Sequence, residues 1–198
     1  LDKIEWPAMQ ILPRLYRNMA GYGINGPELN IARGLHRKVW YKNQLVFDTV
    51  EELFDLFAGA GVKAVSLKGL AMCIGWLDDP GLRQMNDVDI LVPQNRVPEA
   101  YELLEANGWR HDAPLWDGRV VNYLHSTQFV KADGELDLHW TLLPETINTD
   151  CAAGVLERAR PVQWRGREVL IPDVHDMVFH LCVHGIKQTD SRLRWIVD

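Results

Sequence analysis

Cysteine is scarce in this chain of 198 residues, which has three. Cys73, Cys151 and Cys182 are widely spaced, form no CxxC pair and cannot all pair with one another. A disulfide framework is therefore not predicted, and the expected location is the cytoplasm, where thiols stay reduced.

Long hydrophobic runs are also missing. No apolar stretch approaches the ~20 residues that a membrane helix needs, and no signal-peptide pattern opens the chain. The composition, 47% hydrophobic and 24% charged, is that of an ordinary globular protein of about one domain. The chain begins at Leu1 and ends at Asp198 within an expected helix, so we expect both ends to continue.

Basic residues are in deficit, with 21 Lys and Arg against 27 Asp and Glu, and the net charge is −6. Proteins that bind nucleic acid over a wide surface usually cluster Lys and Arg there. The balance therefore argues against an extended nucleic-acid surface, but it leaves room for a local basic cleft.

The first 60 residues have a helical pattern. A turn-rich break, from Gly21 to Pro27, divides them into two helices. In the second helix, apolar side chains at spacings of four, three, one and three form one face, comprising Val46, Val50, Leu53, Phe54 and Phe57. Gly59 and Gly61 are its expected stop signals. Residues 1–60 are thus predicted to be a helical segment that packs on the core.

Residues 61–172 read as a mixed core of short strands and helices. Strands are expected at 62–67 and 87–92, with helices at 69–76 and 97–106 after them. Two hairpins follow, with turns at Asp133-Gly134 and at Arg165-Gly166-Arg167. An amphipathic helix with Asp173 as N-cap starts a C-terminal helical region, residues 173–198. The predicted class is α+β, with a small mixed sheet flanked by N-terminal and C-terminal helices.

Three aspartates are the most informative residues. Side chains alternate along a strand, so Asp87 and Asp89 project from one face, and Asp137 shares a face with Glu135 and His139 on a later strand. If the two strands are neighbours, the three aspartates converge and repel one another unless a cation joins them. Such an all-oxygen site suits Mg²⁺ with substrate phosphates, and two such ions can assist an in-line phosphoryl displacement.

A phosphate-binding turn is expected upstream, where Ser66-Leu67-Lys68-Gly69 joins a strand to a helix. The first turn of a helix offers unpaired N–H groups and a positive dipole end, and glycine lets a phosphate approach closely. Ser66 and Lys68 would add a hydroxyl and a charge. Arg83, four residues before Asp87, is a second cation predicted for this site.

The conjunction of these motifs resembles the uncharacterised nucleotidyltransferase family of the DNA polymerase β-type nucleotidyltransferase superfamily. The similarity extends over roughly residues 45–198, and the Asp-Val-Asp-Ile-Leu-Val block is its most specific part. The motifs that carry it are Ser66–Ala71, Arg83–Val92, Glu135–Trp140 and His180–Gly185.

This resemblance implies a small mixed sheet, dependence on Mg²⁺ and transfer of a nucleotidyl group from an NTP. It implies that Asp87 and Asp89 bind the metals, while Asp137 completes the metal site and helps activate the acceptor. One position departs from the superfamily, which usually has Gly-Ser or Gly-Gly at the turn. Here Leu70 follows Gly69, so the usual Ser hydroxyl is missing and Lys68 would have to compensate.

Further residues are candidates for substrate contact. His139 shares a face with Asp137, and a proton relay and a structural role are both open for it. His180 and His184 share a helix face, where substrate contact or packing is favoured over zinc binding. Lys187 and Arg192 belong to a modest basic cluster that is either solvated or in contact with a triphosphate or acceptor.

We therefore predict an enzyme that uses Mg²⁺, or Mn²⁺, and an NTP to transfer an NMP to a hydroxyl or phosphate acceptor with release of pyrophosphate. The acceptor, a small molecule, peptide, protein or RNA end, stays open. Two alternatives also stay open: transfer of the terminal phosphate at the same site, and a non-catalytic nucleotide-binding module.

Overall fold

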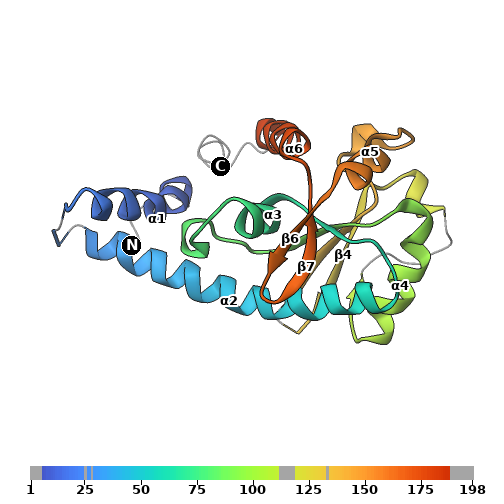
Figure 1. Cartoon of the computed structure of the whole chain (residues 1–198), viewed down its shortest axis with the longest axis horizontal. Helices are drawn as coiled ribbons and strands as arrows, with labels where there is room; N and C mark the ends of the chain where they lie inside the picture. The colour runs from blue at the N-terminus through green and yellow to red at the C-terminus, as the bar shows by residue number, and fades with distance from the viewer. Residues whose placement is uncertain (1–5, 25, 28, 112–118, 133, 188–198) are drawn as a thin grey trace.

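Two helices occupy the N-terminal part of the chain in the computed structural model, which describes residues 6–24, 26, 27, 29–111, 119–132 and 134–187. Helix α1 (Trp6–Gly21) lies alongside the first half of α2 (Leu29–Gly59), as Figure 1 shows. The break predicted at residues 21–27 separates them. Helix α2 ends at Gly59, and Gly61 adopts a positive φ of 65°. The glycine stop signals are thus confirmed.

A mixed sheet of seven strands forms the centre of the described chain, in the order β3-β4-β5-β2-β1-β7-β6. Neighbouring strands are antiparallel except for two parallel pairs, β2 with β5 and β1 with β7. The strands are β1 (Val65–Ser66), β2 (Val88–Leu91), β3 (Arg110–His111), β4 (Ser126–Lys131), β5 (Gly134–His139), β6 (Arg160–Trp164) and β7 (Arg167–Ile171).

Shorter helices connect the strands. They are α3 (Lys68–Gly75), α4 (Val97–Ala106), α5 (Cys151–Arg158) and α6 (Val174–Lys187), with 3-10 turns η1 (Pro80–Leu82), η2 (Gln94–Arg96), η3 (Val120–Asn122) and η4 (Pro144–Thr146). The predicted boundaries at residues 60 and 172 fall between α2 and β1 and between β7 and α6.

The predicted elements are confirmed in kind, with three differences. The first predicted strand, 62–67, is strand only at Val65–Ser66: residues 62–64 form no strand pair, and after Leu67 the chain turns into α3 at Lys68. The short strand β3 and the helix α5 were not predicted. Their apolar content is too slight and too brief to show a period, and β3 exists only because it pairs with β4.

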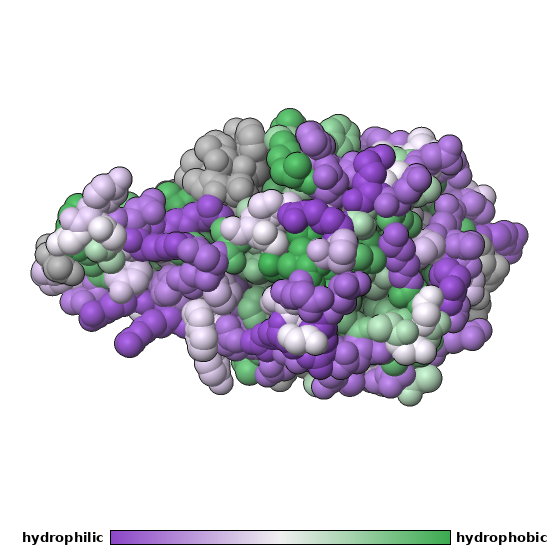
Figure 2. Space-filling view, viewed as in Figure 1, coloured by the Kyte–Doolittle hydropathy of each residue, from purple (hydrophilic) through white to green (hydrophobic). Residues whose placement is uncertain are grey.

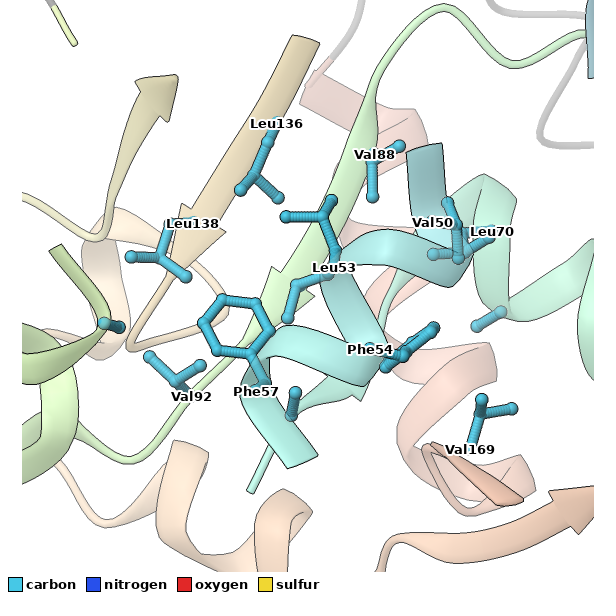
Figure 3. Packing of buried hydrophobic residues seen from close by; sticks show 14 of the residues in the cluster. Val50, Leu53, Phe54, Phe57, Leu70, Val88, Val92, Leu136, Leu138 and Val169 are labelled. Carbon is cyan, nitrogen blue, oxygen red and sulfur yellow. The ribbon is translucent and has the colours of Figure 1, made fainter. Parts of the chain in front are cut away.

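The two faces of the sheet bury two different apolar clusters, and α6 contributes to both. On one face, α2 buries Val50, Leu53 and Phe57, and Figure 3 shows Leu53 and Phe57 pointing toward Leu136, Leu138 and Val92 of the sheet region. On the other face, a smaller cluster joins the sheet to α5 and α6 and contains Val65, Leu67, Leu91, Leu142, Leu143, Ala152, Val155 and Leu156, with Val183 against it. Because strand side chains alternate, Asp89, Asp137 and His139 belong to this second face.

The outer surface is mostly hydrophilic along α2, whereas hydrophobic surface is visible over α6 (Figure 2). The exposed apolar side chains of α6 are Val174, Val178, Phe179 and Ile186. Among the described residues, no helix combines the length and apolarity needed to cross a membrane.

Candidate functional site

Two aspartates lie side by side in the middle of the sheet. Strands β2 and β5 are parallel neighbours, and their register sets Asp89 directly opposite Asp137. His139, two residues further along β5, projects from the same face. Ligand atoms of Asp89, Asp137 and His139 all lie within 4.8 Å of one another. The predicted convergence of these strands is therefore present.

Asp89 is buried and doubly paired. The residue is 2% exposed, and its Oδ1 accepts hydrogen bonds from Lys68 Nζ at 2.5 Å and from His139 Nε2 at 2.9 Å. Burial acts to raise the pKa of this carboxyl, but the charge of Lys68 and the bonds from His139 outweigh it and hold the pKa well below its usual range. Asp89 is thus an ionised carboxylate within the protein.

The other two aspartates have raised rather than lowered pKa values. Desolvation by the surrounding protein, followed by the negative charge of Asp89, raises the pKa of both Asp137 and Asp87. Asp87 lies in the bend before β2 and is partly open to solvent. It is not a member of the cluster of Asp89, Asp137 and His139. Strand geometry predicted this repulsion among the three carboxylates, although Asp87 lies outside the cluster that the other two form with His139.

The turn between β1 and α3 is unusual at two adjacent positions. Lys68 has a positive φ of 44°, a conformation that is strained for a residue with a side chain. At Gly69, a Cβ atom would lie 2.1 Å from Nη1 of Arg83, so only glycine leaves room for this guanidinium. Arg83 is 8% exposed. The structure thus brings Lys68, Gly69 and Arg83 together at the first turn of α3, as predicted.

Ser66, in contrast, is not brought to this turn. It alternates with Leu67 and belongs to the α2 side of the sheet, where its hydroxyl donates to the Leu170 carbonyl at 3.0 Å. The side chain is fully buried. Because its hydroxyl bonds the backbone of β7, Ser66 supports the sheet, and the predicted contact with phosphate does not fit this geometry.

Two histidines of α6 cover the aspartate face. His180 is 2% exposed, and neither of its ring nitrogens has a hydrogen-bond partner. Burial, and then the charge of Lys68, lower its pKa to about 3; the same causes lower that of His184 to about 4. The two ring centroids are 6.2 Å apart. Both imidazoles are therefore neutral, and His180 has polar atoms left to bind a ligand.

The described residues include only part of the basic cluster predicted near the end of the chain. Lys187 is the last residue of α6, and Arg192 lies outside the described residues. The contacts predicted for these two side chains therefore stay predictions.

Sequence reasoning missed Asn43 on α2, which is fully buried. Its amide nitrogen donates to the carbonyls of Pro80 and Arg83, at 2.6 and 2.7 Å, and its Oδ1 accepts from Met85 N–H at 3.1 Å. Asn43 thus anchors the segment that carries Arg83 and leads into β2. An asparagine in the apolar series Val39, Asn43, Phe47 and Val50 was the available signal.

The donor set of the site fits a divalent cation. Asp89 and Asp137 offer oxygen ligands, which suit Mg²⁺ and Mn²⁺. His139 Nε2 bonds Asp89, so His139 orients that carboxylate, while its Nδ1 is buried and unpaired. The pKa values of Asp87 and Asp137 are raised by desolvation and then by the negative charge of Asp89, and a cation would compensate that charge.

The fold is shared with known structures. The antibiotic-resistance factor ANT(2'')-Ia superposes with a TM-score of 0.54 over 78% of this chain and 81% of its own, at 14% identity. TM1012 of Thermotoga maritima, a candidate nucleotidyltransferase, gives 0.54 over 76% and 92% of the two chains, at 10% identity. At sequence identities this low, the structural similarity shows a shared fold.

Sequence comparison is more specific. None of the curated proteins matches this chain. The family model described as uncharacterised nucleotidyltransferase matches residues 7–198, nearly the entire sequence. The chain therefore belongs to the uncharacterised nucleotidyltransferase family.

Proposed function

We propose that this protein transfers an NMP from an NTP to a hydroxyl or phosphate acceptor and releases pyrophosphate. The observation that carries the proposal is the register of β2 on β5, which pairs Asp89 with Asp137 on one face of the sheet. Lys68, at the first turn of α3, is bonded to the same Asp89. Carboxylates for a cation and basic groups for a polyphosphate thus lie within one site.

Asp89 and Asp137 would hold Mg²⁺ or Mn²⁺, with Asp87 as a further ligand from the adjoining bend. The ion, when bound, supplies positive charge to the polyphosphate and to the departing pyrophosphate. Gly69, Lys68 and Arg83 would receive the phosphates, because the first turn of α3 presents N–H groups beside two cationic side chains.

The acceptor would approach from the side of Asp137. In the reaction, an acceptor oxygen forms a bond to the α-phosphorus while the bond to the pyrophosphate oxygen breaks, and the acceptor proton passes to Asp137. Lys68 bonds Asp89, so Asp137 is the carboxylate of the pair proposed to take up this proton. Otherwise the chain acts by positioning and by neutralising charge.

The buried His180 would contact the acceptor or nucleotide through its unpaired ring nitrogens, with His184 beside it. Lys187 and Arg192 are proposed as further phosphate or acceptor contacts, on the sequence alone. His139 would act through Asp89, which it orients.

Two labelled forms of each NTP test the proposal. The protein is incubated with a cell extract, Mg²⁺ and α- or γ-labelled NTP, and the products are analysed by mass. We expect the α label to enter an acceptor and the γ label to appear in pyrophosphate. Transfer of the γ label would instead show a phosphotransferase, and nucleotide binding without turnover would show a non-catalytic module.

Matched variants assign the activity to the site. Asp89→Asn and Asp137→Asn should abolish transfer. Asp150→Asn makes the same change at an exposed position before α5, where the carboxylate caps no helix N–H, and should leave transfer unchanged. Full activity in either site variant would refute the proposal.

A further inference from the structure

The ammonium group of Lys68 occupies a place in the aspartate site that a divalent cation would compete for. It lies 2.5 Å from Asp89 Oδ1, and the two side chains are only 14% and 3% exposed. The same oxygen also accepts from His139 Nε2. One carboxylate oxygen of the proposed metal site is therefore already bonded to two donors.

The chain also places Lys68 there at a cost. Its φ of 44° lies in the left-handed region, which residues other than glycine adopt rarely. The next residue, Gly69, lies so close to the Arg83 guanidinium that an added Cβ would be 2.1 Å from its Nη1. Arg165 adopts a similar conformation at an exposed turn, whereas the side chain of Lys68 is only 14% exposed and is bonded to Asp89.

A fixed positive charge beside a metal ligand weakens the binding of a cation at that ligand. Coulomb repulsion between an ammonium and a divalent ion is strong where water is excluded from both. This repulsion acts whichever oxygen of Asp89 the ion binds. If the ion takes Oδ1, the bond from Lys68 must also break. Both effects act against a metal ion that binds alone.

We propose that Lys68 is an internal cation that keeps divalent metal out of the nucleotide-free site. This inference rests on the metal site of the proposed function. A polyphosphate bound at the first turn of α3 offers Lys68 a different anionic partner, so the metal and the nucleotide enter together. Free metal would therefore bind weakly, and Asp89 would stay paired with Lys68 between turnovers.

The test uses Mn²⁺ alone as the probe and measures its binding to nucleotide-free protein by electron paramagnetic resonance. Lys68→Met removes the charge and keeps the length of the side chain, and we expect Mn²⁺ to bind roughly tenfold more tightly than to the wild type. Lys68→Arg keeps the charge and should bind Mn²⁺ as weakly as the wild type. Lys38→Met, the matched control on the exposed surface of α2, should have no effect.

The double variant Lys68→Met with Asp137→Asn shows where the tighter Mn²⁺ binding arises. If the tighter binding arises at the aspartate site, the second change removes it. Lys68→Gln repeats the loss of charge in case the methionine variant does not fold, and circular dichroism checks the fold of each variant.

The outcomes are distinct. Equal Mn²⁺ affinity in wild type and Lys68→Met, or a gain that survives Asp137→Asn, would overturn the inference and leave the proposed function standing. Failure of every variant to bind Mn²⁺ would overturn the metal site and the proposed function with it. Turnover of NTP enters none of these measurements, so an inactive preparation does not affect the result.

Discussion

Asp89 of β2 and Asp137 of β5 are paired in register, yet only Asp89 is neutralised by Lys68. The two carboxylates are chemically alike and electrostatically unequal. Burial acts to raise the pKa of Asp89, but Lys68 and His139 outweigh it and hold that pKa low, whereas burial and the charge of Asp89 raise the pKa of Asp137. Their amide variants should therefore behave differently.

Asp137→Asn should separate stability from activity. The change removes a carboxylate that Asp89 repels, so the free energy of unfolding should stay constant or rise by about 1 kcal/mol. Transfer of the nucleotide should fall by at least about 100-fold, because a group that binds the reacting atoms is lost. Urea denaturation and turnover of labelled NTP measure the two effects. A clear loss of stability would contradict the assignment of repulsion.

Asp89→Asn should lower both quantities. It leaves the ammonium of Lys68 buried without its counter-charge, and the removal of one partner of a buried pair costs about 3–5 kcal/mol. Urea denaturation should show this loss. Adding Lys68→Met to Asp89→Asn should restore part of it, because the unpaired charge then disappears. Additive effects of the two changes would show that the pair is not coupled.

Gly69→Ala should weaken nucleotide binding. The added methyl group would displace the Arg83 guanidinium, which lies 2.1 Å from the position of that carbon. We expect the KM for NTP to rise about tenfold through the loss of one phosphate contact. Gly34→Ala on α2 is the control, because nothing lies within 4 Å of its added carbon and alanine favours a helix by about 0.5–1 kcal/mol. An unchanged KM in Gly69→Ala would exclude Arg83 from the phosphate site.

Asn43→Ala should loosen the segment before β2. Three buried backbone groups lose their partner, and we expect the free energy of unfolding to fall by about 2–4 kcal/mol. Hydrogen exchange should accelerate at Met85, whose N–H is bonded to Asn43. The control is Asn30→Ala, because Asn30 is exposed and its side chain accepts a hydrogen bond from the exposed Arg33, three residues away. Protection of Met85 that survives Asn43→Ala would contradict the anchoring role.

Acid should destabilise the protein through His180 and His184. Each imidazole is neutral when folded and takes up a proton on unfolding below pH 6.5, so stability falls as the pH decreases from 6.5 toward about 3 to 4. Each should cost about 2 kcal/mol between pH 7 and pH 5. Asp87 and Asp137, whose pKa values are raised, act in the opposite direction at lower pH.

His180→Leu tests this assignment by urea denaturation across the pH range. It should flatten the dependence between pH 7 and pH 5, while the variant and wild-type curves run parallel between about pH 7.5 and pH 8.5. An equally steep dependence in the variant would show that other groups cause the acid sensitivity.

Much of the fold was predictable because it depends on local periodicity. The apolar face of α2, with Val50, Leu53 and Phe57, follows from helical spacing, and the two hairpins follow from their turn residues. The short elements β3 and α5 were not predictable, because each is defined by contacts with distant residues rather than by its own pattern.

For the site, the sequence by itself determined which side chains share a face. The period of two along a strand places Asp137 with His139, and it separates Asp89 from Ile90 on β2. Only the tertiary structure decided that Asp89 is paired with Asp137, that Lys68 bonds Asp89, and that Asn43 anchors the intervening segment. These contacts join residues that are 21 to 48 positions apart in the sequence. Strand register and ion pairing at such separations depend on the packing of the whole core, which no local pattern encodes.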